Sequence, residues 1–221
     1  MSLAKQYFKD TILYKSKYGE RTIVLIQVGA FYEVYGLKHN NNITGSNIEE
    51  FSQKCDLIIA EKTNYIDKKM VVMSGFRDYS LDKYLKKLDD MQYTTIVISQ
   101  DEACCGTTRS ITGIYSPGTY FSNNSTEITN NIMSIWIFTN KHNIIFGIAN
   151  VDIYTGKSVI YEYATGCNKY TMVLDELERF ISIYNPKQTL VIFDNRPTDY
   201  SRILQLFSRC VQELDVDADH P

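Results

Sequence analysis

The sequence of 221 residues lacks several features that would point to particular classes of protein. Its five cysteines are odd in number and form no Cys-x-x-Cys pair, so neither a disulfide framework nor a zinc site is indicated. No run approaches the roughly 18 apolar residues of a membrane span. The start, MSLAKQYFKD, also lacks the apolar segment of a signal peptide. These absences predict a soluble, intracellular protein in a reducing compartment, without a membrane partner.

Motifs for catalysis are missing as well. The chain has no Gly-x-x-x-x-Gly-Lys-Ser/Thr phosphate loop, which excludes an ATP site of that type within these residues. Its three histidines, His39, His142 and His220, are scattered and do not cluster with cysteines or pair with a serine in a recognisable order. We therefore expect no enzymatic activity, no metal and no cofactor in this chain by itself.

An excess of positive charge is also absent. The formal net charge is −3, with 23 Lys and Arg against 26 Asp and Glu. Non-specific affinity for DNA comes mainly from Lys and Arg side chains that neutralise phosphates. Any contact of this chain with DNA must therefore be local.

The composition itself is that of a globular protein with two domains. Hydrophobic residues make up 44% and charged residues 22% of the chain, and its length is comfortable for two domains of roughly 100 residues each. The polar stretch SNNSTEITNN lacks apolar periodicity and is typical of a linker. We predict a first domain over residues 1–122, a linker over 123–130 and a second domain over 131–221, in an α/β (α+β) fold class.

Apolar periodicity predicts a mixed sheet flanked by helices in the first domain. Turn residues, including the sequence SPGT at residues 116–119, separate the segments. The predicted helices cover residues 3–18, about 47–55 and 81–91, and the predicted strands cover residues 22–35, 70–75, 94–99 and 109–115.

In the second domain the pattern predicts three strands in an antiparallel meander, followed by helix, strand and helix. This order implies a mixed sheet covered by helices. The acidic ending VQELDVDADHP shows no closing strand, which predicts that the second domain is incomplete here. The predicted strands are 132–138, 144–154, 157–163 and 189–194, and the helices are 172–184 and 198–213.

The stretch QVGAFYEVYG, residues 27–36, places an aromatic ring and a carboxylate two positions apart. If residues 22–35 form one strand, alternation puts Phe31 and Glu33 on the same face at the strand's end. Apolar wedges of this kind unstack DNA base steps, and Gly29 would let a backbone approach closely. The alternative is that Phe31 packs under the opening helix and Glu33 is a solvated edge residue.

The same stretch resembles the Gly-Asp-Phe-Tyr-Glu-Leu-Phe signature of the mismatch-recognition domain of the MutS family of DNA mismatch-repair proteins. Three further segments resemble the family in the same order: MSGFRDYSLDKYLKKLDDMQYTTIVISQDE, RSITGIYSPGT and, from the connector domain, FGIANVDIYTGK. The resemblance covers roughly residues 5–195. It implies a mixed sheet with helices in the first domain and a ribonuclease-H-like connector in the second.

By this resemblance, Phe31 is the aromatic that stacks on a mispaired base and Glu33 is the hydrogen-bond partner of that base. Lys62 falls near a family arginine that contacts the DNA backbone. The sequence departs from the family at Ala30, where the family usually has Asp, and at Tyr35, where it usually has Phe. The segment Met73, Ser74 and Gly75 matches the family's minor-groove loop, with a strand end and turn as the alternative.

The resemblance also implies that this chain is the N-terminal part of an ATP-dependent protein. Its partners would be double-stranded DNA with mispairs or small loops, a second copy in a homodimer formed through other regions, and a MutL-like repair protein. ATP and Mg²⁺ would be cofactors of the parent protein only. Two alternatives are a protein-interaction module and a ribonuclease-H-like nuclease using Asp152 and Asp194, although two carboxylates alone make a weak metal site.

Overall fold

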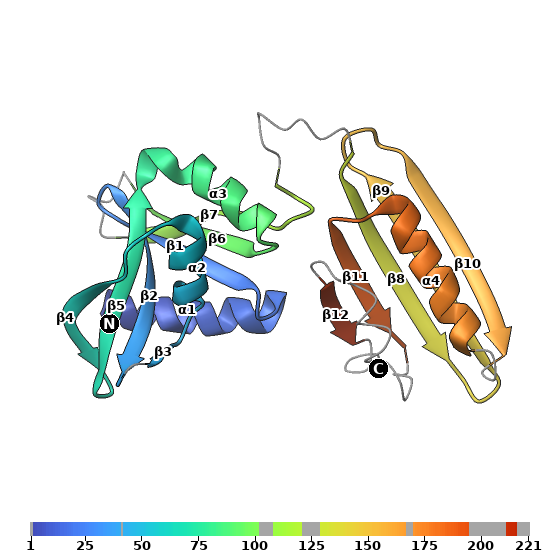
Figure 1. Ribbon diagram of the computed structural model, residues 1–221, viewed down its shortest axis with the longest axis horizontal. Helices are drawn as coiled ribbons and strands as arrows, with labels where there is room; N and C mark the ends of the chain where they lie inside the picture. The colour runs from blue at the N-terminus through green and yellow to red at the C-terminus, as the bar shows by residue number, and fades with distance from the viewer. Residues whose placement is uncertain are drawn as a thin grey trace. The chain divides into compact units, whose positions relative to one another are not determined.

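The computed structural model describes residues 2–40, 42–101, 108–120, 129–166, 170–194 and 211–215 (Figure 1). The chain divides into two compact units, Met1–Asn123 and Asn124–Pro221. Most of the predicted linker, up to residue 128, lies outside the described residues. Each unit contains a mixed sheet with helices, which confirms the predicted α+β fold class. No helix in the described part of the chain is both long and apolar enough to cross a membrane.

The first unit is built on one sheet with the strand order β4-β5-β2-β1-β6-β7, and β3 pairs with β2. Only β1 and β6 run parallel, and the other pairs are antiparallel. Its helices are α1 (Leu3–Tyr18), α2 (Ile48–Cys55) and α3 (Leu81–Asp90), and its strands are β1 (Thr22–Val28), β2 (Phe31–His39), β3 (Asn42–Thr44), β4 (Ala60–Ile66), β5 (Lys69–Arg77), β6 (Thr94–Gln100) and β7 (Arg109–Tyr115).

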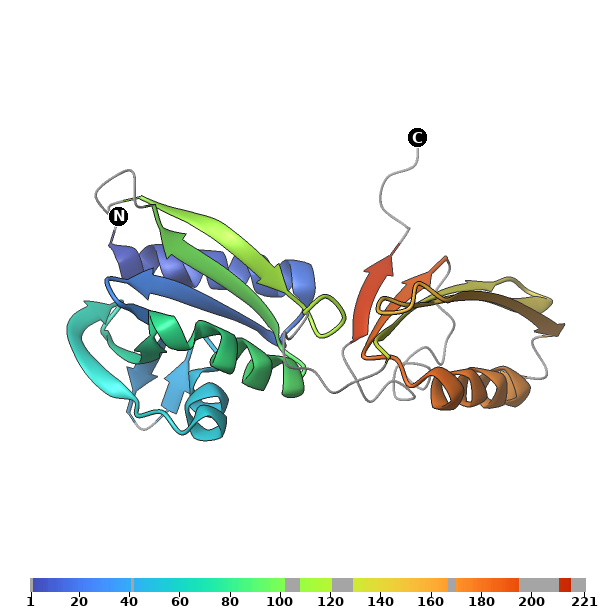
Figure 2. The same ribbon diagram turned by 90° about the horizontal axis from the view of Figure 1, so that it is seen from above.

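Helices cover both faces of this sheet (Figure 2). Helix α1 packs on one face, where the ring of Tyr7 lies 5.0 Å from that of Tyr35 in β2. The helix ends at Gly19, whose φ of +89° is one that glycine tolerates. On the opposite face, Phe76 of β5 stacks on Tyr84 of α3, with ring centroids 4.0 Å apart. The three predicted helices of this unit are confirmed.

Tyr7 lies at the centre of this core and makes its stability depend on pH. Its side chain is fully buried, and its hydroxyl donates to the Val24 carbonyl at 3.2 Å. Burial is the main cause that raises the pKa of Tyr7 from 10.0 to about 12. Because the folded pKa exceeds the unfolded one, the stabilisation is complete below pH 10 and is lost as the pH rises to about 12.

We therefore expect alkaline unfolding that depends on the Tyr7 hydroxyl. Between pH 10 and 12 the wild-type chain should lose about 2–3 kcal/mol more unfolding free energy than Tyr7→Phe, which has no proton to release. Denaturant unfolding followed by circular dichroism at several pH values measures the difference. Parallel pH curves for the two proteins would contradict the expectation.

The predicted single strand over residues 22–35 is wrong, because the segment is a β-hairpin. Strand β1 ends at Val28, Gly29 and Ala30 form the turn, and β2 begins at Phe31, which pairs with Val28. Gly29 has φ +59°, as the first central residue of a type II′ turn requires. The turn carries no Asn-Gly or Asp-Gly signal, so the two strands look like one apolar run in the sequence.

The second unit has the strand order β10-β9-β8-β11-β12. The first three strands form an antiparallel meander, and β11 runs parallel to β8 and β12, in agreement with the expected ribonuclease-H-like topology. Helix α4 covers one face of this sheet (Figure 2). The elements are β8 (Asn131–Thr139), β9 (Asn143–Asp152), β10 (Ser158–Gly166), α4 (Tyr170–Tyr184), β11 (Gln188–Phe193) and β12 (Val211–Asp215).

The end of the second unit differs from the prediction. A helix was predicted over residues 198–213. Residues 198–210 lie outside the described residues, and residues 211–213 belong to strand β12. The expectation that the ending has no closing strand is therefore wrong. Strand β12 pairs with β11 from Val211 to Asp215, and these long-range hydrogen bonds override a weak local pattern.

Candidate functional site

The hairpin that carries the predicted site is fixed to the neighbouring strands by hydrogen bonds. The Gly29 amide donates to the Gln100 side chain and the Gln100 amide donates to the Gln27 side chain, both at 2.9 Å. The Arg109 guanidinium donates to the Gln27 carbonyl, also at 2.9 Å. On the other side, the Asp78 amide donates to the Ala30 carbonyl at 3.0 Å. The turn is therefore tied to β6, to β7 and to the segment that follows β5.

Phe31 begins β2 directly after this turn, and its side chain is accessible. The residue is 42% exposed, whereas the five residues that follow it in β2 are buried. Its cross-strand partner in β5 is Arg77, whose guanidinium lies 5.7 Å from the centre of the Phe31 ring. This distance is that of a cation–π contact. The alternative, in which Phe31 packs under the opening helix, does not agree with this exposure.

Glu33 lies on the same face of β2 as Phe31, two residues further along, as the sequence predicts. Its environment differs from the prediction, because the residue is only 5% exposed. The Glu33 carboxylate forms an ion pair with Lys62 of β4 at 2.6 Å and accepts a hydrogen bond from the Tyr35 hydroxyl at 2.5 Å. Glu33 is therefore neither a solvated edge residue nor an open carboxylate.

Tyr35 connects this ion pair to the core of the first unit. Its ring packs edge-on against Tyr7, and its hydroxyl lies 3.2 Å from the Lys62 ammonium. Burial, followed by the hydrogen bond to Glu33, raises the pKa of Tyr35 far above its usual value. The phenol therefore remains a hydrogen-bond donor at any physiological pH.

Lys62, predicted from the resemblance to lie near the DNA backbone, already has protein partners. Besides the ion pair with Glu33, its ammonium lies 4.7 Å from the centre of the Tyr35 ring. Its side chain is 28% exposed. An ammonium held by a carboxylate, a phenol and an aromatic face is poorly placed to contact a phosphate.

The segment Met73, Ser74 and Gly75 lies inside β5, which continues to Arg77, so the predicted loop or turn is wrong. Ser74 is fully buried, and Gly75 pairs with Glu33. A Cβ atom at Gly75 would lie 2.5 Å from the Tyr32 carbonyl oxygen. Gly75 therefore permits the close pairing that places Glu33, whereas Met73 is partly exposed and pairs with Tyr35.

In the second unit, Asp152 organises a turn. Its carboxylate accepts hydrogen bonds from the Asn130 amide at 2.9 Å, the Tyr154 amide at 3.1 Å and the Thr155 hydroxyl at 2.5 Å. The Thr155 bond is the main cause that lowers the pKa of Asp152. These contacts give Asp152 a structural role. The described residues hold no group of three or more acidic, His or Cys side chains suited to a metal ion.

Two residues of the site were not predicted from the sequence. Arg77 becomes a neighbour of Phe31 only through the pairing of β2 with β5, and the sequence marks Tyr35 only as a departure from the family motif. Strand β4, which carries Lys62, is mostly polar and was not predicted. The segment EKTNYI contains β-branched and aromatic residues, a weak signal for an edge strand.

Comparison with known proteins places these residues in a family. The family model described as MutS domain I matches residues 3–124. The chain is 27% identical over 212 residues to a protein of Acanthamoeba polyphaga mimivirus named as a DNA mismatch repair protein mutS homolog, covering 89% of this chain and 18% of that protein. It is also 27% identical over 199 residues to the DNA mismatch repair protein MutS of Parabacteroides distasonis, covering 88% and 20% respectively.

The chain thus spans about a fifth of the length of these curated relatives. Among solved structures, a Ppx/GppA family protein from Aquifex aeolicus is 14% identical and superposes with a TM-score of 0.26, covering 40% of this chain and 36% of that one. A score this low does not bear on the fold or the function of this chain.

Proposed function

The chain belongs to the MutS family of DNA mismatch-repair proteins, and we propose that its first unit binds mispaired duplex DNA by inserting the Phe31 ring at the mispair. The observation that carries the proposal is the accessibility of this one ring. Phe31 is 42% exposed at the start of β2, beside a fixed hairpin turn and a buried strand. A ring in this position can leave the protein surface without disturbing the core.

A mispair is the favoured target because its pairing and stacking are already weakened. Inserting an apolar wedge into a matched duplex requires unstacking of an intact base step. At a mispair the same deformation costs less, so the protein discriminates through deformability. A stacked base then gains roughly 1–3 kcal/mol from the aromatic ring. Glu33, the predicted partner of the base, lies on the same face of the strand.

Arg77 supplies positive charge next to the wedge. Its guanidinium lies over the Phe31 ring, and it is exposed and takes no part in the ion pairs of the described residues. When the ring inserts between bases, the guanidinium comes close to the adjacent backbone. A local phosphate contact of this kind agrees with the net charge of −3, which gives no general attraction to DNA.

We expect Arg77→Gln to weaken binding to matched and mispaired duplexes by a similar factor. The slope of log K against log salt concentration should become shallower by about 0.9, the value for one lost phosphate contact. Fluorescence anisotropy titrations at four or more salt concentrations measure the slope. A loss of affinity confined to the mispaired duplex, with an unchanged slope, would contradict a phosphate contact.

The proposed function is tested by titrating the full-length protein with two duplexes that differ only at one G·T mispair. We expect tighter binding to the mispaired duplex. Hydrogen exchange on the complex should show protection over residues 29–35, because these residues would lie against the DNA. Equal affinity for the two duplexes, or protection elsewhere only, would overturn the proposal and favour a protein-docking role.

A further inference from the structure

The two oxygens of the Glu33 carboxylate have different environments. Oε2 accepts both contacts, from the Lys62 ammonium at 2.6 Å and from the Tyr35 hydroxyl at 2.5 Å. Oε1 accepts no hydrogen bond from the described residues, and it is not completely covered by other atoms. One oxygen therefore anchors the side chain, and the other keeps its capacity to accept a hydrogen bond at the edge of a residue that is only 5% exposed.

The anchor is built from groups that only donate to the carboxylate. The Lys62 ammonium can donate hydrogen bonds but cannot accept them. Burial is the main cause that raises the pKa of Tyr35, so the Tyr35 phenol keeps its proton. A carboxylate held in this way is itself an acceptor of hydrogen bonds. It can accept an N–H from a base edge but offers none in return.

The position of Lys62 follows from the strand order of the sheet. Strand β4 pairs with β5, and β5 pairs with β2, so Lys62 must reach across β5 to meet Glu33. The residue of β5 opposite Glu33 is Gly75, which has no side chain. A Cβ atom at Gly75 would lie 3.3 Å from Glu33 Cγ, so the glycine leaves room for the Glu33 side chain.

We propose that Lys62 and Tyr35 are positioning residues that hold Glu33 beside Phe31, so that its Oε1 atom accepts an N–H from a mispaired base. Lys62 acts through Glu33 and makes no phosphate contact. The inference rests on the proposed function, because it assigns a task within mispair recognition. A Phe, which the family motif usually has at the position of Tyr35, would lack the hydroxyl that donates to Glu33.

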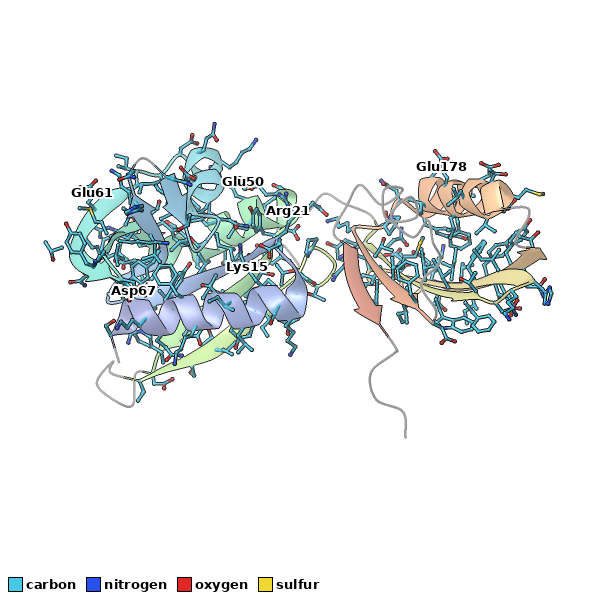
Figure 3. All side chains as sticks on the ribbon, turned by 90° about the horizontal axis from the view of Figure 1, so that it is seen from below. Lys15, Arg21, Glu50, Glu61, Asp67 and Glu178 are labelled. Carbon is cyan, nitrogen blue, oxygen red and sulfur yellow. The ribbon has the colours of Figure 1, made fainter. Side chains whose placement is uncertain are left out.

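The sheet offers a matched control for Lys62. Lys38 of β2 forms an ion pair with Glu61 of β4 at 2.6 Å, so the same two strands carry a second Lys–Glu pair. Glu61 lies on the outer strand of the sheet (Figure 3). The side chains of Lys38 and Glu61 are 37% and 54% exposed, so this pair is more exposed than that of Lys62 and Glu33, at 28% and 7%. Lys38→Met and Lys62→Met remove the same charge from the same region.

The experiment measures the affinity of the full-length protein for a G·T-mispaired duplex and its matched counterpart at several salt concentrations. For Lys62→Met we expect the ratio of the two affinities to fall about ten-fold, the effect of losing one hydrogen bond to a charged group, with unchanged salt slopes. For Lys38→Met we expect an unchanged ratio. A slope shallower by about 0.9 with an unchanged ratio would show a phosphate contact and overturn the proposal. An unchanged ratio and slope would overturn it too.

Tyr35→Phe keeps the test decisive if Lys62→Met does not fold. This variant removes one donor to Oε2, retains the ring that packs on Tyr7, and leaves the charge unchanged. A several-fold fall in the affinity ratio supports the inference, and an unchanged ratio overturns it.

The wild-type protein tests the proposed function separately from the positioning role. If the wild-type protein does not distinguish mispaired from matched duplex, the proposed function fails. If it does, and both Lys62→Met and Tyr35→Phe keep this preference, only the positioning role is overturned.

Discussion

Phe31→Ala should abolish most of the preference of the full-length protein for mispaired DNA. The ring would contribute roughly 1–3 kcal/mol by stacking on a base, so the ratio of mispaired to matched affinity should fall by a factor of about 5 to 150. Affinity for matched duplex should change little, because the wedge gains nothing there. Competition titrations with the two duplexes measure the ratio directly.

The same substitution should leave the protein folded. Phe31 is 42% exposed, and its removal opens no cavity in the core. Tyr65→Ala is the control, since Tyr65 is an exposed aromatic of the same sheet, on β4 rather than β2. We expect Tyr65→Ala to bind both duplexes like wild type. A Phe31→Ala protein that keeps the wild-type ratio would refute the wedge.

The helices of the first unit could be predicted because their apolar residues follow a clear helical period. Leu85 and Leu88 of α3 are buried where the period places them, and α1 ends at Gly19 as expected. Strand β7 follows the predicted range, because the segment is bounded by turn residues. These features depend on local sequence, and local sequence is sufficient to specify them.

The geometry of the site depends on pairing between distant segments, which local patterns do not specify. Glu33 meets Lys62 across a third strand, and Phe31 meets Arg77 through the register of β2 with β5. One strand alone predicts that Glu33 is exposed, because alternation indicates the face of the sheet and not what covers that face. Phe31 was predicted to be exposed near the end of one long strand. It is exposed, but at the start of β2, because the sequence pattern does not reveal the two-residue turn that precedes it.

The closing strand of the second unit was missed for a related reason. Strand β12 has only five residues, and its stability comes from parallel pairing with β11. A segment of this length gives too few positions for helical and extended periods to be distinguished. By contrast, the long strands β8 and β9, of nine and ten residues, were predicted correctly from their sequence.

Gly75→Ala should have the second large effect, on the stability of the first unit. The added Cβ would lie 2.5 Å from the backbone oxygen of Tyr32 and 3.3 Å from the Cα and Cγ atoms of Glu33. Backbone atoms between two paired strands cannot move aside as a flexible side chain can. Overpacking of this kind costs about 1–3 kcal/mol, which we expect as a decrease in the unfolding free energy measured by chemical denaturation.

Gly147→Ala is the matched control, because Gly147 also lies within a strand, β9, but a Cβ atom there would have no neighbour within 4 Å. It should leave stability within about 0.5 kcal/mol of wild type or raise it slightly, since alanine restricts the unfolded chain. Similar losses for the two variants would indicate a general cost of replacing strand glycines. A loss specific to Gly75→Ala, accompanied by weaker mispair discrimination, would tie the close pairing of β2 and β5 to the placement of Glu33.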